Sequence, residues 1–262
     1  MDLQFAFSLW NFNHLNRQFQ LADVADFASA LNFGVELWPS FSDIDDLFTP
    51  QTRADYLDLF KEIPTSLHTR TNQNQLSLHQ AQIDAARDYG ARVVVLHSDD
   101  FYQENSRKIN AELIAQACDY AEKAGIQLAL ENGQFVTIQE MLACDQRLKF
   151  CLDLGHVFLV PETLEQFLNA FQDRLIHVHI HDFNPKIPEL IPPYSDGLLP
   201  DHHIPGFGTI PSEIWQTLFA SLEENNFSGS IVLEICPANP FQAILLGMQN
   251  LDGILNQSGL SM

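Results

Sequence analysis

The chain has 262 residues, of which 46% are hydrophobic and 18% are charged, a composition typical of a globular protein with a sizeable core. Its 13 Lys and Arg residues stand against 34 Asp and Glu residues, which gives a formal net charge of −21. Proteins that bind nucleic acid collect basic side chains to displace counterions from phosphates, so this charge balance argues against a nucleic-acid partner.

The sequence offers no signal for a membrane or for secretion. No apolar run approaches the roughly 20 residues of a membrane-spanning helix, and the first residues, Met-Asp-Leu-Gln-Phe, lack the basic region of a signal peptide. The cysteines are widely scattered and are expected to be buried free thiols: Cys118, Cys144, Cys151 and Cys236. We therefore predict a cytoplasmic protein with no membrane partner.

Short apolar strands alternate with amphipathic helices along the chain. Strands are predicted at residues 3–9, 34–38, 65–68, 92–97, 127–131, 148–154, 175–182 and 230–235. Helices are predicted at residues 21–31, 52–62, 77–89, 110–123, 137–144, 163–171, 211–224 and 241–255, with a Pro- and Gly-rich loop over 184–208.

Eight strands that are each followed by a helix predict a parallel sheet closed into a (β/α)8 TIM barrel, an α/β fold that forms a single domain over residues 1–262. An open, doubly wound sheet is the alternative. That fold would place a glycine-rich phosphate turn after the first strand, and residues 8–12, Ser-Leu-Trp-Asn-Phe, contain no glycine. The barrel is therefore favoured.

The predicted seventh strand, Leu-Ile-His-Val-His-Ile-His-Asp, alternates apolar and imidazole side chains. Because strand side chains alternate faces with a period of two, His177, His179 and His181 share one face. Neutral imidazole is the commonest protein ligand for metals, so the row favours a metal site. A polar strand face that binds nothing is the alternative interpretation.

In TIM barrels the active site forms at the C-terminal ends of the strands. Most of the predicted strands end in a group that can bind a metal or transfer a proton. These groups are Glu36, His68, His97, Glu131, Asp153 with His156, His179 with His181, and Glu234. One such residue is usually an ordinary polar group, but a closed barrel directs all of these strand ends toward one place.

The carboxylates carry the stronger part of this prediction. Glu131 and Glu234 each end an apolar run, and a buried carboxylate is costly unless it meets a cation. Lys and Arg are scarce near both in the sequence, which favours a metal as that cation. Asp153 and His156 are three residues apart across a strand end, a spacing that lets both side chains face a shared site.

Other side chains leave alternatives open. His68 and His97 are either metal or substrate contacts or hydrogen-bonded core histidines, whereas His14 and His79 are expected at the surface and outside the site. The aromatic residues after the first two strands form either an apolar wall against a ligand or part of the core: Trp10, Phe12 and Trp38.

Five short motifs together give the chain a family resemblance. They are Gly34-Val35-Glu36-Leu37, Leu130-Glu131-Asn132, Cys151-Leu152-Asp153-Leu154-Gly155-His156, the segment from His177 to Asp182, and Leu233-Glu234. With them the chain resembles, over its whole length, the xylose isomerase-like TIM-barrel superfamily of sugar phosphate isomerases and epimerases. Inosose dehydratases and endonuclease IV also belong to that superfamily.

The resemblance implies a cofactor and a ligand set. One divalent ion, Mn, Mg, Zn or Co, would be bound by Glu131, Asp153, His179 and Glu234. His156 would contact the substrate, and the position of His181 is often lysine in relatives. Substrate contacts are expected from Glu36, His68, His97, His156, His181 and Lys186.

The function implied by the resemblance is that of an isomerase or epimerase acting on a small sugar, polyol or hydroxy-keto acid. Glu131 and Glu234 would act as acid and base around an enediolate. Arg70 and Lys186 are the only cations expected near the site, which favours unphosphorylated substrates. A dehydratase of the inosose or dehydroshikimate type is a close alternative because it begins with the same proton abstraction, and a barrel that binds metal without turnover is another.

Endonuclease IV is the more distant alternative. Nine residues can be matched to its three-zinc ligand set: His68, His97, Glu131, Asp153, His156, His179, Asp201, His203 and Glu234. The net charge of −21, Glu36 and the lack of basic loops that could grip DNA argue against this activity. A small-molecule substrate is therefore the expected partner, and a homo-oligomer is compatible with the sequence.

Overall fold

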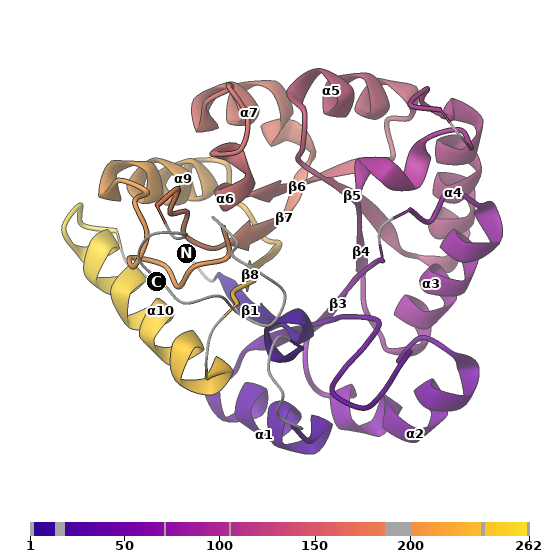
Figure 1. The fold of residues 1–262 in the computed structure, drawn as a ribbon, viewed down its shortest axis with the longest axis horizontal. Helices are drawn as coiled ribbons and strands as arrows, with labels where there is room; N and C mark the ends of the chain where they lie inside the picture. The colour runs from indigo at the N-terminus through magenta and orange to yellow at the C-terminus, as the bar shows by residue number, and fades with distance from the viewer. Residues whose placement is uncertain are drawn as a thin grey trace.

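Eight parallel strands form a closed barrel in the computed structural model, which describes residues 3–13, 19–70, 72–104, 106–186, 201–236 and 239–260 (Figure 1). The strands are β1 Gln4–Ser8, β2 Gly34–Leu37, β3 Thr65–His68, β4 Val93–Leu96, β5 Gln127–Glu131, β6 Lys149–Asp153, β7 Leu175–Ile180 and β8 Ser230–Leu233. Each strand pairs with the next, and β8 pairs with β1 through Ala6 and Val232. The prediction of a (β/α)8 barrel is confirmed, and the open sheet is excluded.

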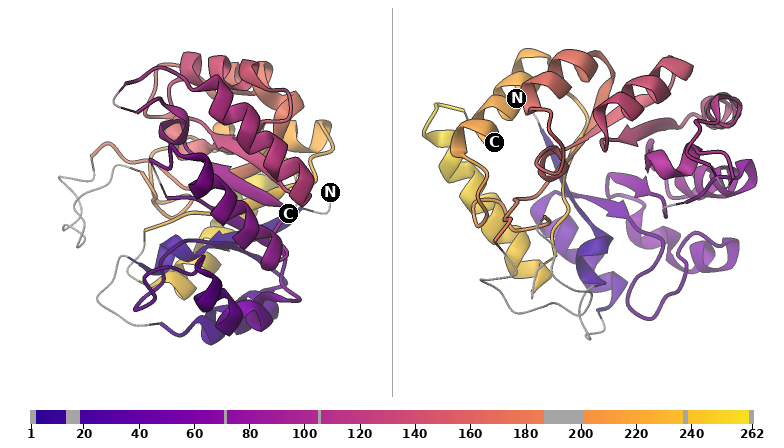
Figure 2. Two further views of the ribbon diagram at one scale, coloured as in Figure 1. Left: turned by 90° about the vertical axis from the view of Figure 1, so that its right-hand side faces the viewer. Right: turned by 45° about the horizontal axis from the view of Figure 1, so that its top comes forward.

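Helices form an outer ring around the strands (Figure 1). They are α1 Leu21–Leu31, α2 Pro50–Phe60, α3 Leu76–Asp88, α4 Ala111–Ala124, α5 Phe135–Cys144, α6 Leu154–Val157, α7 Leu164–Phe171, α9 Ser212–Glu224 and α10 Pro240–Asn256. Three 3-10 turns complete the described elements: η1 Leu9–Phe12, η2 Ser98–Phe101 and η3 Gln172–Arg174. Both ends of the chain lie at the same end of the barrel (Figure 2).

Local sequence signals set several of the helix boundaries. Thr163 caps α7 by accepting the backbone N–H of Gln166, and the Gln166 side chain accepts the N–H of Thr163 in return. Gly125 ends α4 in the left-handed conformation at φ 75°, which glycine adopts without steric cost. The short helix α6 was not predicted, and it begins because the Asp153 carboxylate accepts the N–H of His156.

Some predicted strands extend one or two residues beyond the observed ladder. His97 lies outside β4 because the carboxylate of Asp100 takes its backbone N–H at 2.9 Å. Asp182 lies outside β7 because it pairs with His203 in an isolated antiparallel bridge. The strand ends at the mouth of the barrel are therefore held by side chains and loops, not by the sheet itself.

The described apolar residues pack in two separate places. The larger cluster lies between the sheet and the helices, and the smaller one, Val95, Ala129 and Cys151, lies inside the barrel. Ala129 and Cys151 each precede a carboxylate, Glu131 or Asp153, by two residues and so point to the same side of their strands. Small apolar side chains thus fill the barrel below the polar residues at its mouth.

Two sequence-based expectations can be compared with the described residues directly. The cysteines are free thiols, of which Cys118, Cys151 and Cys236 are buried, whereas Cys144 is exposed, contrary to the prediction. Within the described residues, no helix combines the length and the apolar character needed to span a membrane.

The two glycines of α10 offer a matched test of packing. A Cβ on Gly253 would meet no described atom within 4 Å, so Gly253→Ala should raise the free energy of unfolding by about 0.5–1 kcal/mol. A Cβ on Gly247 would lie 3.1 Å from Leu233 Cδ2, a close contact that opposes the helix-propensity effect. Gly247→Ala should therefore not raise the free energy of unfolding. Urea denaturation of both variants measures the difference, and an equal gain in the two would contradict the packing of α10 against β8.

Candidate metal centre and active site

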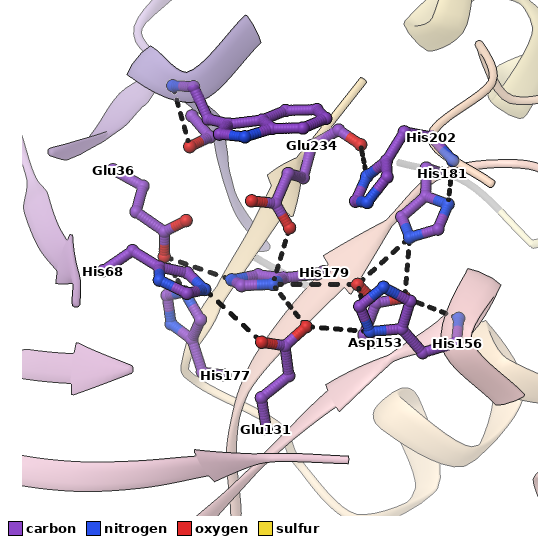
Figure 3. Close-up of polar contacts among 12 residues, drawn as sticks. Glu36, His68, Glu131, Asp153, His156, His177, His179, His181, His202 and Glu234 are labelled. Carbon is purple, nitrogen blue, oxygen red and sulfur yellow. Dashed lines mark hydrogen bonds and ion pairs between the residues drawn. The ribbon is translucent and has the colours of Figure 1, made fainter. Parts of the chain in front are cut away.

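His179 lies at the centre of the polar residues that fill the mouth of the barrel (Figure 3). It is fully buried on β7, and its Nδ1 lies 3.2 Å from Glu234 Oε2, 3.7 Å from Glu131 Oε1 and 3.9 Å from Asp153 Oδ2. Two donors that each lie about 2.1 Å from a tetrahedral metal are about 3.4 Å apart. The distances from Nδ1 to the three carboxylates are therefore close to the distance between two ligands of one divalent ion.

The hydrogen bonding of these atoms supports the same conclusion. Neither carboxylate oxygen of Glu131 nor Nδ1 of His179 makes a well-aligned hydrogen bond with a described residue, although all three atoms are buried and face imidazole or carboxylate groups. Buried polar atoms without such bonds are costly, and a bound cation would satisfy them together. Three of the expected ligands, Glu131, His179 and Glu234, form one group with His68 whose ligand atoms lie within 4.8 Å of one another, whereas Asp153 groups with Glu131 and His156. A single ion held by Glu131, Asp153, His179 and Glu234 stays a prediction.

Three further histidines surround Glu131. His68 Nε2 and His97 Nε2 lie 3.4 and 3.3 Å from its Oε2, and His156 Nδ1 lies 3.1 Å from its Oε1. Burial by itself raises the pKa of Glu131, but the imidazoles of His156, His179 and His68 hold that pKa well below its usual value. Glu131 is therefore ionised.

Asp153 is fixed through both its side chain and its backbone. His181 Nε2 lies 2.8 Å from Asp153 Oδ1, and His181 Nδ1 accepts the backbone N–H of His202 at 2.8 Å. The proton of a neutral His181 must therefore be on Nε2, facing Asp153. The side-chain amide of Asn132 bonds to both the N–H and the C=O of Asp153. Burial raises the pKa of Asp153, but His156 and His181 lower it to about 2.

Asn11 holds Glu234 in a comparable way from the opposite side of the barrel. Its Nδ2 donates to the carbonyl of Leu233 at 3.0 Å, and its Oδ1 accepts the N–H of Ile235 at 2.8 Å. The two bonds flank Glu234 at the end of β8. The sequence analysis missed Asn11 and gave no role to Asn132. Asn132 follows β5 directly and Asn11 lies in η1, three residues after the end of β1, near strand ends where free backbone groups need partners.

The rim of the site is more exposed than its centre. The side chains of His97 and His156 are 25% and 23% exposed, whereas those of His179 and Glu131 are at most 2% exposed. Asp201 joins the rim, with its Oδ2 3.6 Å from His156 Nε2. A ligand can therefore approach the buried carboxylates past the two exposed imidazoles.

The three aromatic residues divide between the rim and the core. The rings of Trp38 and His68 are 4.8 Å apart, and those of Trp10 and His202 are 4.5 Å apart. Phe12 is fully buried among phenylalanines of the outer core. The two tryptophans thus lie beside the site, and Phe12 does not.

Several predicted contacts lie in other places. Glu36 is fully buried and lies against His177 and His179, beneath the mouth of the barrel. Lys186 is exposed, and no contact in the described residues joins it to the carboxylates. His203 of the endonuclease-like set pairs with Asp182 through its backbone. His14 lies outside the described residues.

The prediction that His79 lies at the surface is wrong. Its side chain is on the inward face of α3, where the residue is 1% exposed and stacks on Phe101 at 5.0 Å. Its Nε2–H donates to the carbonyl of Asp100 at 3.4 Å. The Asp100 carboxylate in turn accepts the N–H of His97 and the hydroxyl of Thr69, so this cluster supports the ends of β3 and β4.

Comparison with known sequences identifies the family. A sequence model described as xylose isomerase-like TIM barrel matches residues 54–252. The chain belongs to this family. The resemblance inferred from the motifs is thereby confirmed.

Individual relatives within the family are enzymes. Inosose dehydratase of Clostridium beijerinckii is 26% identical over 159 residues, which are 54% of this chain and 52% of that protein. Fructoselysine 3-epimerase of Escherichia coli O157:H7 is 26% identical over 136 residues, 48% of this chain and 44% of that protein. This chain thus spans about half the length of the curated relatives it matches.

A solved structure of the IolI protein with a bound zinc atom has the same fold. It superposes with a TM-score of 0.73 at 16% identity and covers 97% of this chain and 99% of its own. The curated relatives named above are a dehydratase and an epimerase.

The buried His79 predicts a pH dependence of stability. Burial lowers the pKa of His79 to about 4, below the 6.5 of the unfolded chain, so protonation favours unfolding. The contribution of neutral His79 to the free energy of unfolding is complete above pH 6.5 and decreases by up to about 3 kcal/mol as the pH falls to 4. His79→Phe, which keeps a ring against Phe101, should lose less stability than the wild type between pH 6.5 and 4.

Urea denaturation of metal-free protein at several pH values measures this difference. Ser77→Ala, an exposed substitution in the same helix, is the control and should follow the wild-type profile. A His79→Phe profile parallel to that of the wild type would mean that His79 does not titrate in this range.

Proposed function

We propose that this protein is a divalent-metal-dependent epimerase or isomerase that acts on a small unphosphorylated sugar, polyol or hydroxy-keto acid. The observation that carries the proposal is the convergence of three carboxylates on Nδ1 of His179. The relatedness to fructoselysine 3-epimerase supports the reaction class. The absence of Lys or Arg from the ion pairs described at the site supports an unphosphorylated substrate.

Glu131, Asp153, His179 and Glu234 would hold the metal ion. When bound, a divalent cation polarises neighbouring substrate oxygens and stabilises the negative charge that develops when a proton leaves the adjacent carbon. Three anionic oxygens and one imidazole nitrogen suit Mn, Mg, Zn or Co. The remaining chemistry falls to side chains of this chain.

Glu131 and Glu234 are placed to serve as the acid and the base. They stand on β5 and β8, well separated around the barrel, so a substrate between them would have one carboxylate on each side. His68, His97 and His156 stabilise the charge of Glu131 and make it the weaker base. Glu234 has only the ion pair with His179 among the described residues, so we assign proton abstraction to Glu234.

The rim would bind and orient the substrate. The partly exposed rings of His97 and His156 can donate to or accept from hydroxyl groups, and Trp10 and Trp38 offer apolar faces for carbon-bound hydrogens. Contact of Lys186 with the substrate stays a prediction. Closing these groups over the substrate would exclude water from the charged intermediate.

Dehydration is the second candidate because inosose dehydratase is among the relatives. Both reactions begin with removal of a proton beside a carbonyl, and dehydration adds the loss of a neighbouring hydroxyl group as water. A panel of ketohexoses, fructoselysine and inososes, incubated with the protein in D2O and followed by NMR, separates the two. Epimerisation incorporates deuterium and keeps every hydroxyl group, whereas dehydration removes one hydroxyl group as water and leaves an enol that becomes a second carbonyl group.

Metal content tests the proposed centre. We expect one ion per chain after incubation with Mn, Co or Zn and removal of the excess. His179→Gln and Asp153→Asn should each lose most of it because each removes one donor. Asp201→Asn, which alters a rim carboxylate outside the set, is the control and should keep the ion. Three ions in the wild type would favour the endonuclease alternative, and none would refute the proposed centre.

Glu234→Gln tests the assignment of the base. At saturating metal, the substitution should lower kcat by about 10²–10⁴-fold on any substrate found in the panel, because an amide cannot accept the proton. Glu224→Gln changes an exposed glutamate on α9 and should leave kcat unchanged. Full activity of Glu234→Gln would exclude Glu234 as the base.

A further inference from the structure

Glu36 lies on the side of the His179 ring that faces away from Asp153 (Figure 3). It stands on β2, is fully buried, and uses a single oxygen for all its described hydrogen bonds. That oxygen, Oε2, lies 2.9 Å from His177 Nε2 and 3.1 Å from His179 Nε2, and it accepts the hydroxyl of Ser66 at 3.3 Å. Neither a substrate nor solvent reaches the carboxylate at this depth.

We infer that Glu36 is a positioning residue that fixes which nitrogen of His179 faces the metal. The inference rests on the proposed metal function. A neutral imidazole carries its proton on one nitrogen and a lone pair on the other. With the proton on Nε2, His179 donates to Glu36 and directs the Nδ1 lone pair at the point where Glu131, Asp153 and Glu234 converge.

The opposite tautomer is disfavoured by the same geometry. With the proton on Nδ1, the lone pair of Nε2 would face Glu36 Oε2 at 3.1 Å inside the barrel. Two acceptors at that distance repel each other, and no solvent is present to screen them. Glu36 therefore selects the tautomer that binds a metal and prevents the His179 ring from turning over.

Glu36 also offers His179 a carboxylate in place of a neutral acceptor. Both imidazoles and the hydroxyl of Ser66 face its Oε2, and donors of this kind favour the ionised form of a carboxyl group. A hydrogen bond to an ionised acceptor is stronger than one to a neutral amide, and it increases the basicity of the ligating nitrogen. The carboxylate of Glu36 thus favours metal binding at Nδ1 of His179, although the imidazole ring separates the carboxylate from the metal.

This role explains the row of three histidines on β7 and just after it. Only His179 has a nitrogen directed at the metal centre. His177 donates to the same Glu36 oxygen from below, and His181 donates to the metal ligand Asp153 from above. The row therefore consists of one ligand and two supports, and each support acts on a carboxylate.

Zinc affinity measures the contribution of Glu36. Glu36→Gln keeps the size of the side chain and a hydrogen-bond acceptor but removes the charge, so the dissociation constant for zinc should rise about 10–100-fold. Ser66→Ala is the matched control because it removes a donor from the same oxygen and leaves the charge in place. Its dissociation constant should stay within about twofold of the wild type. Competition with a chromophoric chelator gives all three values.

Nitrogen-15 NMR of histidine-labelled protein loaded with cadmium-113 identifies the coordinating atom. In the wild type, we expect cadmium coupling at His179 Nδ1 and a slowly exchanging proton on Nε2. In Glu36→Gln that proton should exchange faster. A general loss of packing would instead broaden resonances from histidines throughout the barrel, including His79.

The outcomes separate this inference from the function on which it rests. A wild type that binds no zinc overturns the proposed metal centre. A wild type that binds zinc while Glu36→Gln binds it equally well, or coordination through Nε2, overturns only the role of Glu36. If Glu36→Gln does not fold, Glu36→Asp is measured in its place. It retains the charge, but its side chain is one methylene group shorter, so the carboxylate lies farther from His179. A wild-type affinity in that variant would refute the inference, and a weaker affinity would support it.

Discussion

The concentration of negative charge inside the barrel is the constraint on which the rest of the site depends. Glu36, Glu131, Asp153 and Glu234 are each at most 4% exposed, and no Lys or Arg in the described part of the chain pairs with them. Several ionised carboxylates in so small a volume repel one another and have lost their water. Imidazole rings surround these carboxylates. A neutral imidazole adds a lone pair, which is a further acceptor, and only a protonated ring adds positive charge. The proposed divalent cation at His179 Nδ1 would add positive charge where the carboxylates converge.

The barrel meets a second requirement, which is to hold these side chains where the sheet ends and the backbone loses its partners. Asn132 bonds to both backbone groups of Asp153, and Asn11 bonds to the backbone on either side of Glu234. Asp100 accepts the backbone N–H of His97 at the end of β4. Asp182 accepts the N–H groups of Phe183, Gly206 and Ile210 and so folds the loop that carries Asp201 and His202. The precision of the site comes from these amide and carboxylate clamps, since loops alone leave strand ends mobile.

The sequence predicts the fold and the members of the site better than it predicts their roles. Periodicity of two identifies His177, His179 and His181 as neighbours because it reports the direction of each Cβ. It cannot report which nitrogen is protonated, which depends on contacts such as that of His179 with Glu36, 143 residues away. Asn11 was missed for the same reason, because its partners lie more than 220 residues further along the chain. His79 was misplaced because its helix has a partly polar inner face that only the Asp100 cluster explains.

The arrangement also suggests how one family can perform epimerisation and dehydration. Both reactions need a stabilised negative charge beside a carbonyl, and the buried centre supplies this with atoms that no substrate displaces. What distinguishes the reactions is the fate of the neighbouring hydroxyl group, which depends on whether an acid lies beside it. In this chain the groups that would act there are His97, His156 and Asp201 at the partly exposed rim; His97 and Asp201 lie in loops, and His156 lies in α6. Because His97 and His156 also contact Glu131, Asp201 is the rim position where a substitution would change the surroundings of that hydroxyl group without removing a direct contact of the carboxylates around His179.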